Sequence, residues 1–217
     1  MEHSFMVDVE IKEWKCFPTT VYTFNSIESV LQEHENMIVD IKTCLKENAR
    51  VNKRNTKVNL LQTEPDLHNL PSFKQLSIFV SQLCSDALIQ EGYEKQKIEI
   101  TQMWANQQTD GSHHPPHTHA NSILSGIYYI KATDNSAGTQ FFDPKIQAHR
   151  FKPRREKSNW DNSSMVEFSA VTGTGVIFPS WLSHWTPINT DERISISWNI
   201  LVRGNYGEPG TLQNAYI

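Results

Sequence analysis

Histidines crowd into one short segment of this chain. Four of the nine lie within seven residues, at positions 113, 114, 117 and 119 of the stretch HHPPHTH, and a β-rich run follows at once. If His117 and His119 occupy the first residues of a strand, their side chains share a face and lie about 6–7 Å apart. Two imidazoles placed in this way can bind one metal ion.

A third ligand has to come from another part of the chain. His184 is the candidate, because it follows a strand and a tight turn in the stretch FPSWLSH. Taken alone, it reads equally well as a half-buried histidine that donates to a backbone carbonyl. Together with the earlier H-x-H pair, it favours a metal site built from His117, His119 and His184.

The segment that begins at Arg193 alternates strictly between polar and apolar residues. Its polar members are Arg193, Ser195, Ser197 and Asn199, and its apolar members are Ile194, Ile196, Trp198 and Ile200. Such a polar face usually meets water, but in a barrel it can line the interior. If residues 189–192 form a hairpin turn after the strand of His184, Arg193 lies on the order of 10 Å from His184. A short dicarboxylate that chelates the metal would then reach the guanidinium, which binds carboxylates bidentately, and Ser195 could add a hydroxyl donor.

The elements that must position these residues change character along the chain. A strand is predicted at 5–12, a helix behind the capping-box pair Asn25 and Glu28, and a second helix from Ser72 to Gly92. Short β-rich runs then follow, at 97–106, 122–132, 138–142, 165–169, 175–178 and 194–202. We therefore expect a mainly β fold with flanking helices, a sandwich or barrel such as a jelly roll. The polar segment 145–164 is expected to be a long surface loop.

The composition of the chain argues against several kinds of partner and against a disulfide framework. The chain has 217 residues and a net charge of −4, which argues against nucleic acid as a partner. It has no apolar run of roughly 20 residues, so no membrane partner is expected. The cysteines at 16, 44 and 84 are too few and too widely spaced for a disulfide framework. We predict a cytoplasmic protein with a single domain over 1–217, its N-terminal strand and helices in 1–95 and its metal-binding core in 96–205.

Several motifs together resemble a known family. They are HTHANSILSGIYY at 117–129, FDP at 142–144, FPSWLSH at 178–184, TEPDLH at 63–68, and Arg-x-Ser nine residues after His184. This set is similar to the Fe(II)/2-oxoglutarate-dependent dioxygenases. Within them it resembles a "putative 2OG-Fe(II) oxygenase" family of bacterial and phage proteins, over roughly residues 60–205.

The resemblance implies a double-stranded β-helix, or jelly roll, and a function. Iron would be ligated by His117 and His184, while Arg193 and Ser195 would hold the distal carboxylate of 2-oxoglutarate. Tyr129 would donate to the same carboxylate, and Asn106 and Asn199 would face the same cavity. The enzyme would use Fe(II), 2-oxoglutarate and O2 to hydroxylate an unidentified small molecule or peptide, releasing succinate and CO2. A phage-encoded protein would act in the cytoplasm of its host.

One position departs from the pattern of that class. The usual ligand set is two histidines and one carboxylate, whereas His119 stands at the carboxylate position. Asp143, Asn121 or water are the other candidates for this third ligand. Three neutral imidazoles would leave the metal its full charge, which favours binding of anionic 2-oxoglutarate.

Other readings of the same residues stay open. Three histidines with an open position also suit a zinc enzyme, although that leaves the spacing of Arg193 and Ser195 unexplained. A cupin-like module that binds a metal or ligand without oxygenase activity is a further alternative. A homodimer is one possibility for the oligomeric state.

Overall fold

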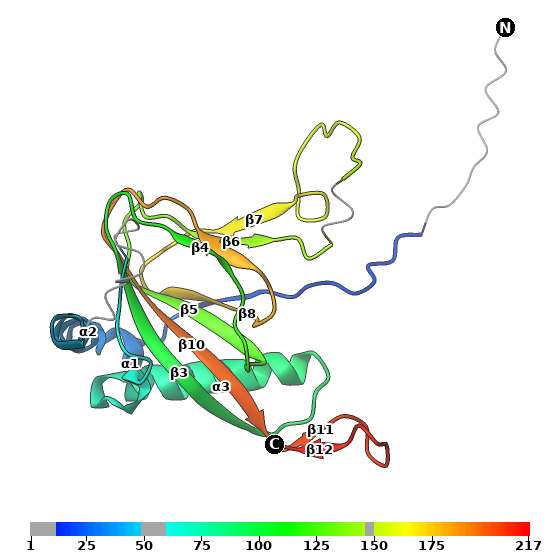
Figure 1. Cartoon of the computed structure of the whole chain (residues 1–217), viewed down its shortest axis with the longest axis horizontal. Coiled ribbons are helices and arrows are strands. Elements are labelled where there is room, and N and C mark those ends of the chain that lie inside the picture. Colours follow the sequence, from blue (N-terminus) through cyan, green and yellow to red (C-terminus); the bar gives the residue numbers. More distant parts are fainter. Residues whose placement is uncertain (1–11, 49–59, 146–149) are drawn as a thin grey trace, which may run out of the picture.

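The computed structural model describes residues 12–48, 60–145 and 150–217, and these residues form two facing β-sheets with helices on one side (Figure 1). The six-stranded sheet has the order β1-β8-β5-β10-β3-β2 and is antiparallel throughout. Its strands are β1 (Tyr22–Asn25), β8 (Thr174–Pro179), β5 (Leu124–Lys131), β10 (Arg193–Arg203), β3 (Lys97–Gln108) and β2 (Leu60–Gln62).

The four-stranded sheet is smaller and is also antiparallel, in the order β4-β9-β6-β7. Its strands are β4 (His114–His117), β9 (His184–Thr186), β6 (Thr139–Phe142) and β7 (Met165–Phe168). The two sheets form the double-stranded β-helix expected from the sequence. A separate hairpin near the C-terminus pairs β11 (Asn205–Tyr206) with β12 (Ala215–Tyr216).

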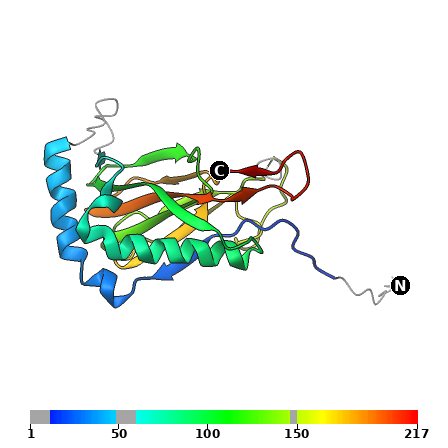
Figure 2. The ribbon, with the colours of Figure 1, turned by 90° about the horizontal axis from the view of Figure 1, so that it is seen from below.

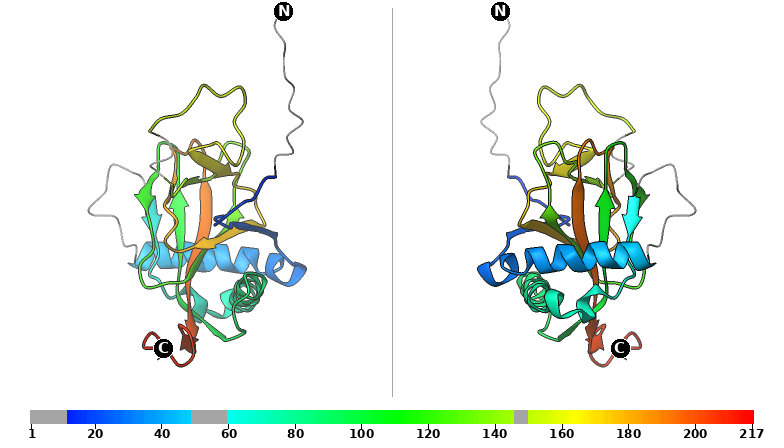
Figure 3. Two further views of the ribbon diagram at one scale, coloured as in Figure 1. Left: turned by 90° about the vertical axis from the view of Figure 1, so that its right-hand side faces the viewer. Right: turned by 90° about the vertical axis from the view of Figure 1, so that its left-hand side faces the viewer.

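The helices lie against the face of the large sheet that is turned away from the small sheet (Figures 2 and 3). They are α1 (Glu28–Leu31), α2 (His34–Asn48) and α3 (Lys74–Gln90), with two short 3₁₀ turns, Leu67–Asn69 and Pro71–Phe73, before α3. Apolar residues of α2 and α3, such as Met37, Ile41, Leu76 and Val80, are buried against the apolar face of the sheet. No helix in the described part of the chain is long and apolar enough to cross a membrane.

Strand β10 carries the alternation that the sequence predicted, and both of its faces are buried. Ile194, Ile196, Trp198 and Ile200 belong to the core beneath the helices. The alternate residues Arg193, Ser195, Ser197 and Asn199 are 2–5% exposed and face the interior between the two sheets. The polar face therefore lines the inside of the barrel, because the second sheet covers it.

Most of the predicted elements are confirmed, with shifts at their ends. The second helix occurs as α3, and Gly92 takes a positive φ of 91° just after it, as expected of a stop signal. The capping box is wrong: Asn25 ends β1, and α1 starts after Ile27 without a side-chain cap. The strand predicted at 5–12 lies outside the described residues, apart from Lys12, which is in no strand.

The connection before β10 also differs from the prediction. Strand β9 pairs with β4 and β6, whereas β10 pairs with β3 and β5, so residues 187–192 cross from one sheet to the other. The hairpin expected at 189–192 is therefore wrong. The described residues of the long segment 145–164 form an irregular surface loop, as predicted, which projects from the small sheet (Figure 1).

Candidate metal centre

Three histidines meet at the interior face of the small sheet. His117 ends β4 and His184 begins β9, and the two are direct partners across the antiparallel ladder. His119 lies two residues beyond β4, where its backbone N–H donates to the carbonyl of Ser180 at 2.9 Å. Candidate ligand atoms of the three side chains all lie within 4.8 Å of one another. The expectation that His117 and His119 share one strand is wrong, but the convergence of all three histidines is observed.

Hydrogen bonds orient all three imidazoles in the same sense. The Nδ1 atoms of His117 and His184 lie 2.9 and 3.0 Å from the carbonyl oxygens of Pro115 and Leu182. A carbonyl oxygen only accepts, so each Nδ1 carries the proton and each Nε2 keeps a free lone pair. His184 thus fits both roles considered from the sequence. It donates a hydrogen bond to a backbone carbonyl, and its Nε2 is still free to bind a metal.

His119 is oriented by a side chain instead of a carbonyl. Its Nδ1 lies 2.6 Å from Oδ1 of Asn199 and 2.8 Å from the hydroxyl of Ser125. The other end of the Asn199 amide donates to Oε1 of Gln102 at 2.8 Å, so its oxygen faces His119. This chain of contacts again places the proton on Nδ1 and leaves Nε2 free, as in metal sites whose ligands are held by outer hydrogen bonds.

The surroundings keep the imidazoles uncharged. Burial lowers the pKa of His184 to about 3 and that of His119 to about 4, and it also lowers the pKa of His117. All three are therefore neutral at pH 7, which is the form that binds a metal. The rings of Phe178 and Phe141 pack against His184, with centroids at 4.6 and 5.7 Å, and shield this side of the cluster from water.

A fourth histidine lies beside the cluster. The ring of His114 is centred 4.2 Å from that of His117, and its pKa falls to about 4, mainly through burial. His114 belongs to the dense histidine segment of the sequence, but no separate role was predicted for it.

Arg193 lies in the interior without a charged partner. It is 2% exposed, its Nη1 donates to Oε1 of Gln108, and its Cζ lies 5.0 Å from the ring centre of Tyr129. Among the described residues, its Nε and Nη2 have no hydrogen-bond partner. The ion pairs within the described residues are Lys15–Asp161, Lys131–Glu192 and Arg203–Glu99, none of which includes Arg193. Burial lowers the pKa of Arg193, yet a guanidinium stays charged at neutral pH.

The other residues predicted to lie near 2-oxoglutarate are on β10 and on the two strands beside it. Ser195 pairs with Asn106 of β3 on one side and with Tyr129 of β5 on the other. The hydroxyl of Tyr129 contacts that of Thr139 at 2.8 Å. In the part of the chain that the structure describes, Oδ1 of Asn106 is buried without a partner. A dicarboxylate suits this end of the barrel, because its oxygens would accept hydrogen bonds from Nε and Nη2 of Arg193, which no described residue accepts.

The two alternative protein ligands lie in turns. Asp143 follows β6, and its carboxylate accepts a hydrogen bond from the backbone N–H of Lys145 at 2.9 Å. It is not part of the cluster formed by the three histidines. Asn121 has a positive φ of 57° in the turn after His119.

Sequence reasoning missed three polar residues of the interior, namely Gln102, Gln108 and Ser125. Gln102 and Gln108 are the β3 partners of Asn199 and Arg193, and Ser125 is the β5 partner of Asn199. Strand pairing could have identified them, because each is a polar residue on a strand next to β10 and faces the same side of the sheet as Arg193.

Comparisons with known proteins agree with this site. Residues 102–199 match the family described as "Putative 2OG-Fe(II) oxygenase". This segment contains all three histidines and Arg193. No curated protein matches the sequence.

Solved structures share the fold at low sequence identity. A prolyl-4-hydroxylase from Pseudomonas putida is 13% identical, with a TM-score of 0.60 over 86% of this chain and 94% of that one. A Trichoplax adhaerens prolyl hydroxylase, solved with a hypoxia inducible factor peptide, is 13% identical, with a TM-score of 0.55 over 82% of each chain. HygX from Streptomyces hygroscopicus, solved with nickel, 2-oxoglutarate and hygromycin B, is 12% identical, with a TM-score of 0.53 over 84% of this chain and 82% of that one.

The fold, the matched segment and the histidine cluster are all similar to those of the 2-oxoglutarate- and Fe(II)-dependent oxygenases. Within that class, the segment 102–199, a little under half of the chain, carries the particular likeness to the family named above. Fe(II) and 2-oxoglutarate are the cofactors of that class, whose members are oxidoreductases.

Proposed function

We propose that His117, His119 and His184 hold Fe(II) through their Nε2 atoms and that Arg193 holds the distal carboxylate of 2-oxoglutarate. The observation that carries this proposal is a buried guanidinium with two unpartnered nitrogen donors, in the same barrel interior as three converging neutral imidazoles. Together, iron and 2-oxoglutarate supply the oxidising power to hydroxylate a C–H bond with O2, leaving succinate and CO2.

The remaining interior residues have distinct parts in this proposal. Tyr129 and Ser195 flank Arg193 and offer hydroxyls to the same carboxylate, and Asn106 lines the cavity beside them. Asn199 acts through His119, because its amide is already engaged by that imidazole and by Gln102. We therefore assign Asn199 to positioning the ligand instead of binding 2-oxoglutarate directly.

His119 is proposed as the third ligand in preference to Asp143 or Asn121. Its support is the cluster itself, which joins His119 to the other two histidines within 4.8 Å. With three neutral ligands the site keeps the full charge of the metal, and the nearby Arg193 adds a further positive charge. Such a site favours a dianionic co-substrate.

We propose a small molecule or a peptide as the substrate. The structural relatives include one solved with a peptide and one solved with hygromycin B. The net charge of −4 argues against nucleic acid, and a homodimer stays an open alternative. We also propose that the chain is a single domain over 1–217 and that it works in the cytoplasm, in keeping with its three free cysteines.

Anaerobic visible absorption tests this function. Apoprotein is titrated with Fe(II) and then with 2-oxoglutarate, and we expect a charge-transfer band that needs both additions. Arg193→Ala should weaken the band. Arg203→Ala, on the same strand but paired with Glu99, should leave it unchanged. A wild-type protein that gives no band, and binds Zn(II) tightly with or without 2-oxoglutarate, would instead support the zinc enzyme or the binding module.

A further inference from the structure

The side chain of Gln108 is held in one orientation by Arg193. Gln108 ends β3, is 1% exposed, and pairs directly with Arg193 of β10. Nη1 of Arg193 donates to Oε1 of Gln108. A guanidinium only donates hydrogen bonds, so the oxygen of the amide must face it and the NH2 group must point away. The orientation of this amide therefore follows from chemistry.

The NH2 group of Gln108 is buried, and no described residue supplies an acceptor for it. Within the described ranges, its Nε2 has no hydrogen-bond partner, like Nε and Nη2 of the adjoining guanidinium. Three buried nitrogen donors thus lie unsatisfied on two side chains that contact each other. Because buried polar groups are nearly always hydrogen-bonded, this group of donors calls for an acceptor with several lone pairs. A carboxylate offers about four such positions on two oxygens.

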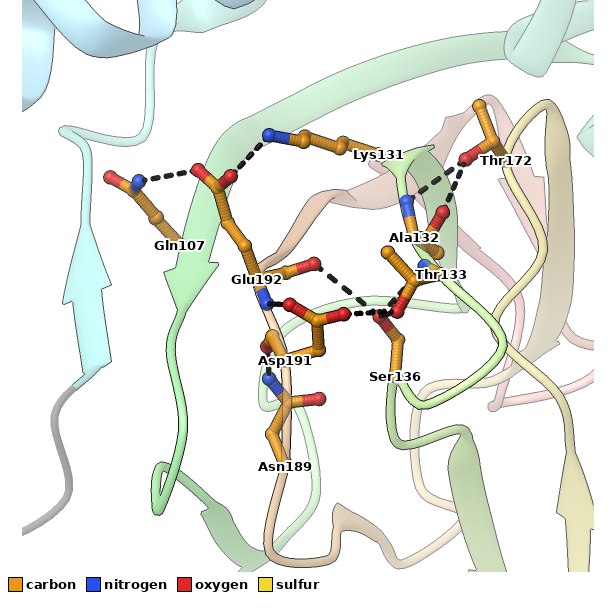
Figure 4. A network of polar contacts seen from close by, with 9 residues as sticks. All are labelled: Gln107, Lys131, Ala132, Thr133, Ser136, Thr172, Asn189, Asp191 and Glu192. Atoms are coloured by element: carbon orange, nitrogen blue, oxygen red, sulfur yellow. Dashed lines mark hydrogen bonds and ion pairs between the residues drawn. The ribbon is translucent and has the colours of Figure 1, made fainter.

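The carboxylates nearest to Arg193 in sequence are engaged elsewhere (Figure 4). Glu192 pairs with Lys131 and accepts from Gln107 at 3.2 Å. Asp191 accepts from the hydroxyl of Thr133 at 2.8 Å and from the backbone N–H of Glu192 at 2.7 Å. These contacts fix the chain as it enters β10, and they leave the charge of Arg193 available to a ligand.

We propose that Gln108 is a binding residue for 2-oxoglutarate, in a role that rests on the function proposed above. Its Oε1 orients the guanidinium of Arg193, and its Nε2 donates to the distal carboxylate that Arg193 binds. A neutral amide suits both tasks. A carboxylate at this position would pair with Arg193 and repel the co-substrate, whereas an apolar side chain would leave Nη1 of Arg193 without an acceptor.

The substitution Gln108→Glu tests this assignment, because it changes folding and binding in opposite directions. Glutamate has nearly the same shape, so it should form an internal ion pair with Arg193 and raise the melting temperature of the apoprotein. The same carboxylate would occupy the donors meant for the co-substrate. We expect 2-oxoglutarate to bind the Zn(II)-loaded variant at least about 100-fold more weakly by calorimetry, with Zn(II) affinity unchanged.

Two further variants complete the test. Gln108→Leu removes the donor without adding charge, so it should weaken 2-oxoglutarate binding about tenfold. It should not weaken binding of 2-oxopentanoate, which lacks the distal carboxylate. Loss of selectivity between these two acids is an effect that a merely structural residue would not produce. The control Gln90→Glu adds the same charge at an exposed position of α3 and should change none of these quantities.

The outcomes separate this inference from the function on which it rests. If wild-type protein loaded with Zn(II) does not bind 2-oxoglutarate, the proposed function fails and this inference fails with it. If wild type binds but Gln108→Glu and Gln108→Leu bind within about threefold of it, the inference alone is overturned. If Gln108→Glu does not fold, the selectivity of Gln108→Leu decides the question.

Discussion

At the scale of single residues, the three histidines of the cluster are held by different kinds of acceptor. Backbone carbonyls fix His117 and His184, and these carbonyls cannot be changed by substitution. His119 alone depends on a side chain, the amide of Asn199. That amide is uncharged, so it fixes the ring without adding negative charge beside the metal. A substitution at Asn199 can therefore change the orientation of His119.

Removing the acceptor of His119 should weaken the metal site. For Asn199→Ala we expect a loss of about 10–100-fold in metal affinity, because His119 Nδ1 loses its strongest partner and the ring can turn. Asn199→Asp keeps an acceptor and should lose less. Affinity is measured by competition between apoprotein and a chromophoric chelator for Co(II) or Zn(II).

Ser197→Ala is the matched control for this prediction. Ser197 lies on the same face of β10, two residues before Asn199. Within the described residues, its hydroxyl is hydrogen-bonded only by the amide of Asn106, at 3.4 Å. Its substitution should leave metal affinity unchanged. Equal affinities for Asn199→Ala and Ser197→Ala would contradict the role given to Asn199.

At the scale of elements, β10 connects the core to the site. Its even-numbered residues pack beneath the helices, and its odd-numbered residues line the barrel, so any shift of the strand moves both sets together. Trp198 is the bulkiest of the packed residues and is fully buried. It faces Gly126, its partner on β5. A Cβ at position 126 would lie 2.1 Å from Cζ2 of the Trp198 ring, so the ring occupies the space that any larger residue would need.

Gly126→Ala should destabilise the fold by about 1–3 kcal/mol, since a rigid buried ring has little room to move. The free energy of unfolding is measured by urea denaturation with circular dichroism. Trp198→Phe provides space at the same contact, so the double variant should lose less than the sum of the two single losses. Strictly additive losses would show that Gly126 and Trp198 do not compete for space.

At the scale of the whole molecule, the site joins the two sheets. His117 and His184 belong to the small sheet, while His119 is bonded to Asn199 and Ser125 of the large sheet. The contact between the hydroxyls of Tyr129 on β5 and Thr139 on β6 also joins the two sheets. A metal bound by all three histidines would therefore resist separation of the sheets as well as loosening of either one.

Metal binding should stabilise the entire fold. With Zn(II) at 100 times its dissociation constant, we expect about 2.7 kcal/mol of additional stability and a higher melting temperature in calorimetry. One transition is expected, since the chain is proposed to be a single domain. His184→Ala should lose most of this gain, whereas His113→Ala, from the same histidine-rich segment as His117, should keep it. Two separate transitions, or an unchanged melting temperature for wild type, would contradict the prediction.

Residue types and local periodicity are enough to predict part of this molecule. The spacing of the histidines indicated a metal, the alternation from Arg193 to Ile200 predicted β10 with its two faces, and helical periodicity with a terminal glycine predicted α3. These inferences succeed because they depend on contacts within a few residues. Resemblance to a family then supplied the jelly roll and the cofactors.

The positions at which those patterns meet depend on the tertiary structure. Strands β4 and β9 have four and three residues, too few for a recognisable period, yet their pairing sets His117 opposite His184. Nothing local indicates that Asn199 would bond to His119, 80 residues away. The alternation of polar and apolar residues likewise predicts a strand with two different faces, but it does not indicate which face another element covers. Arg193 is buried and unpaired because a second sheet closes over the polar face of β10, and that closure depends on strand pairings between distant parts of the chain.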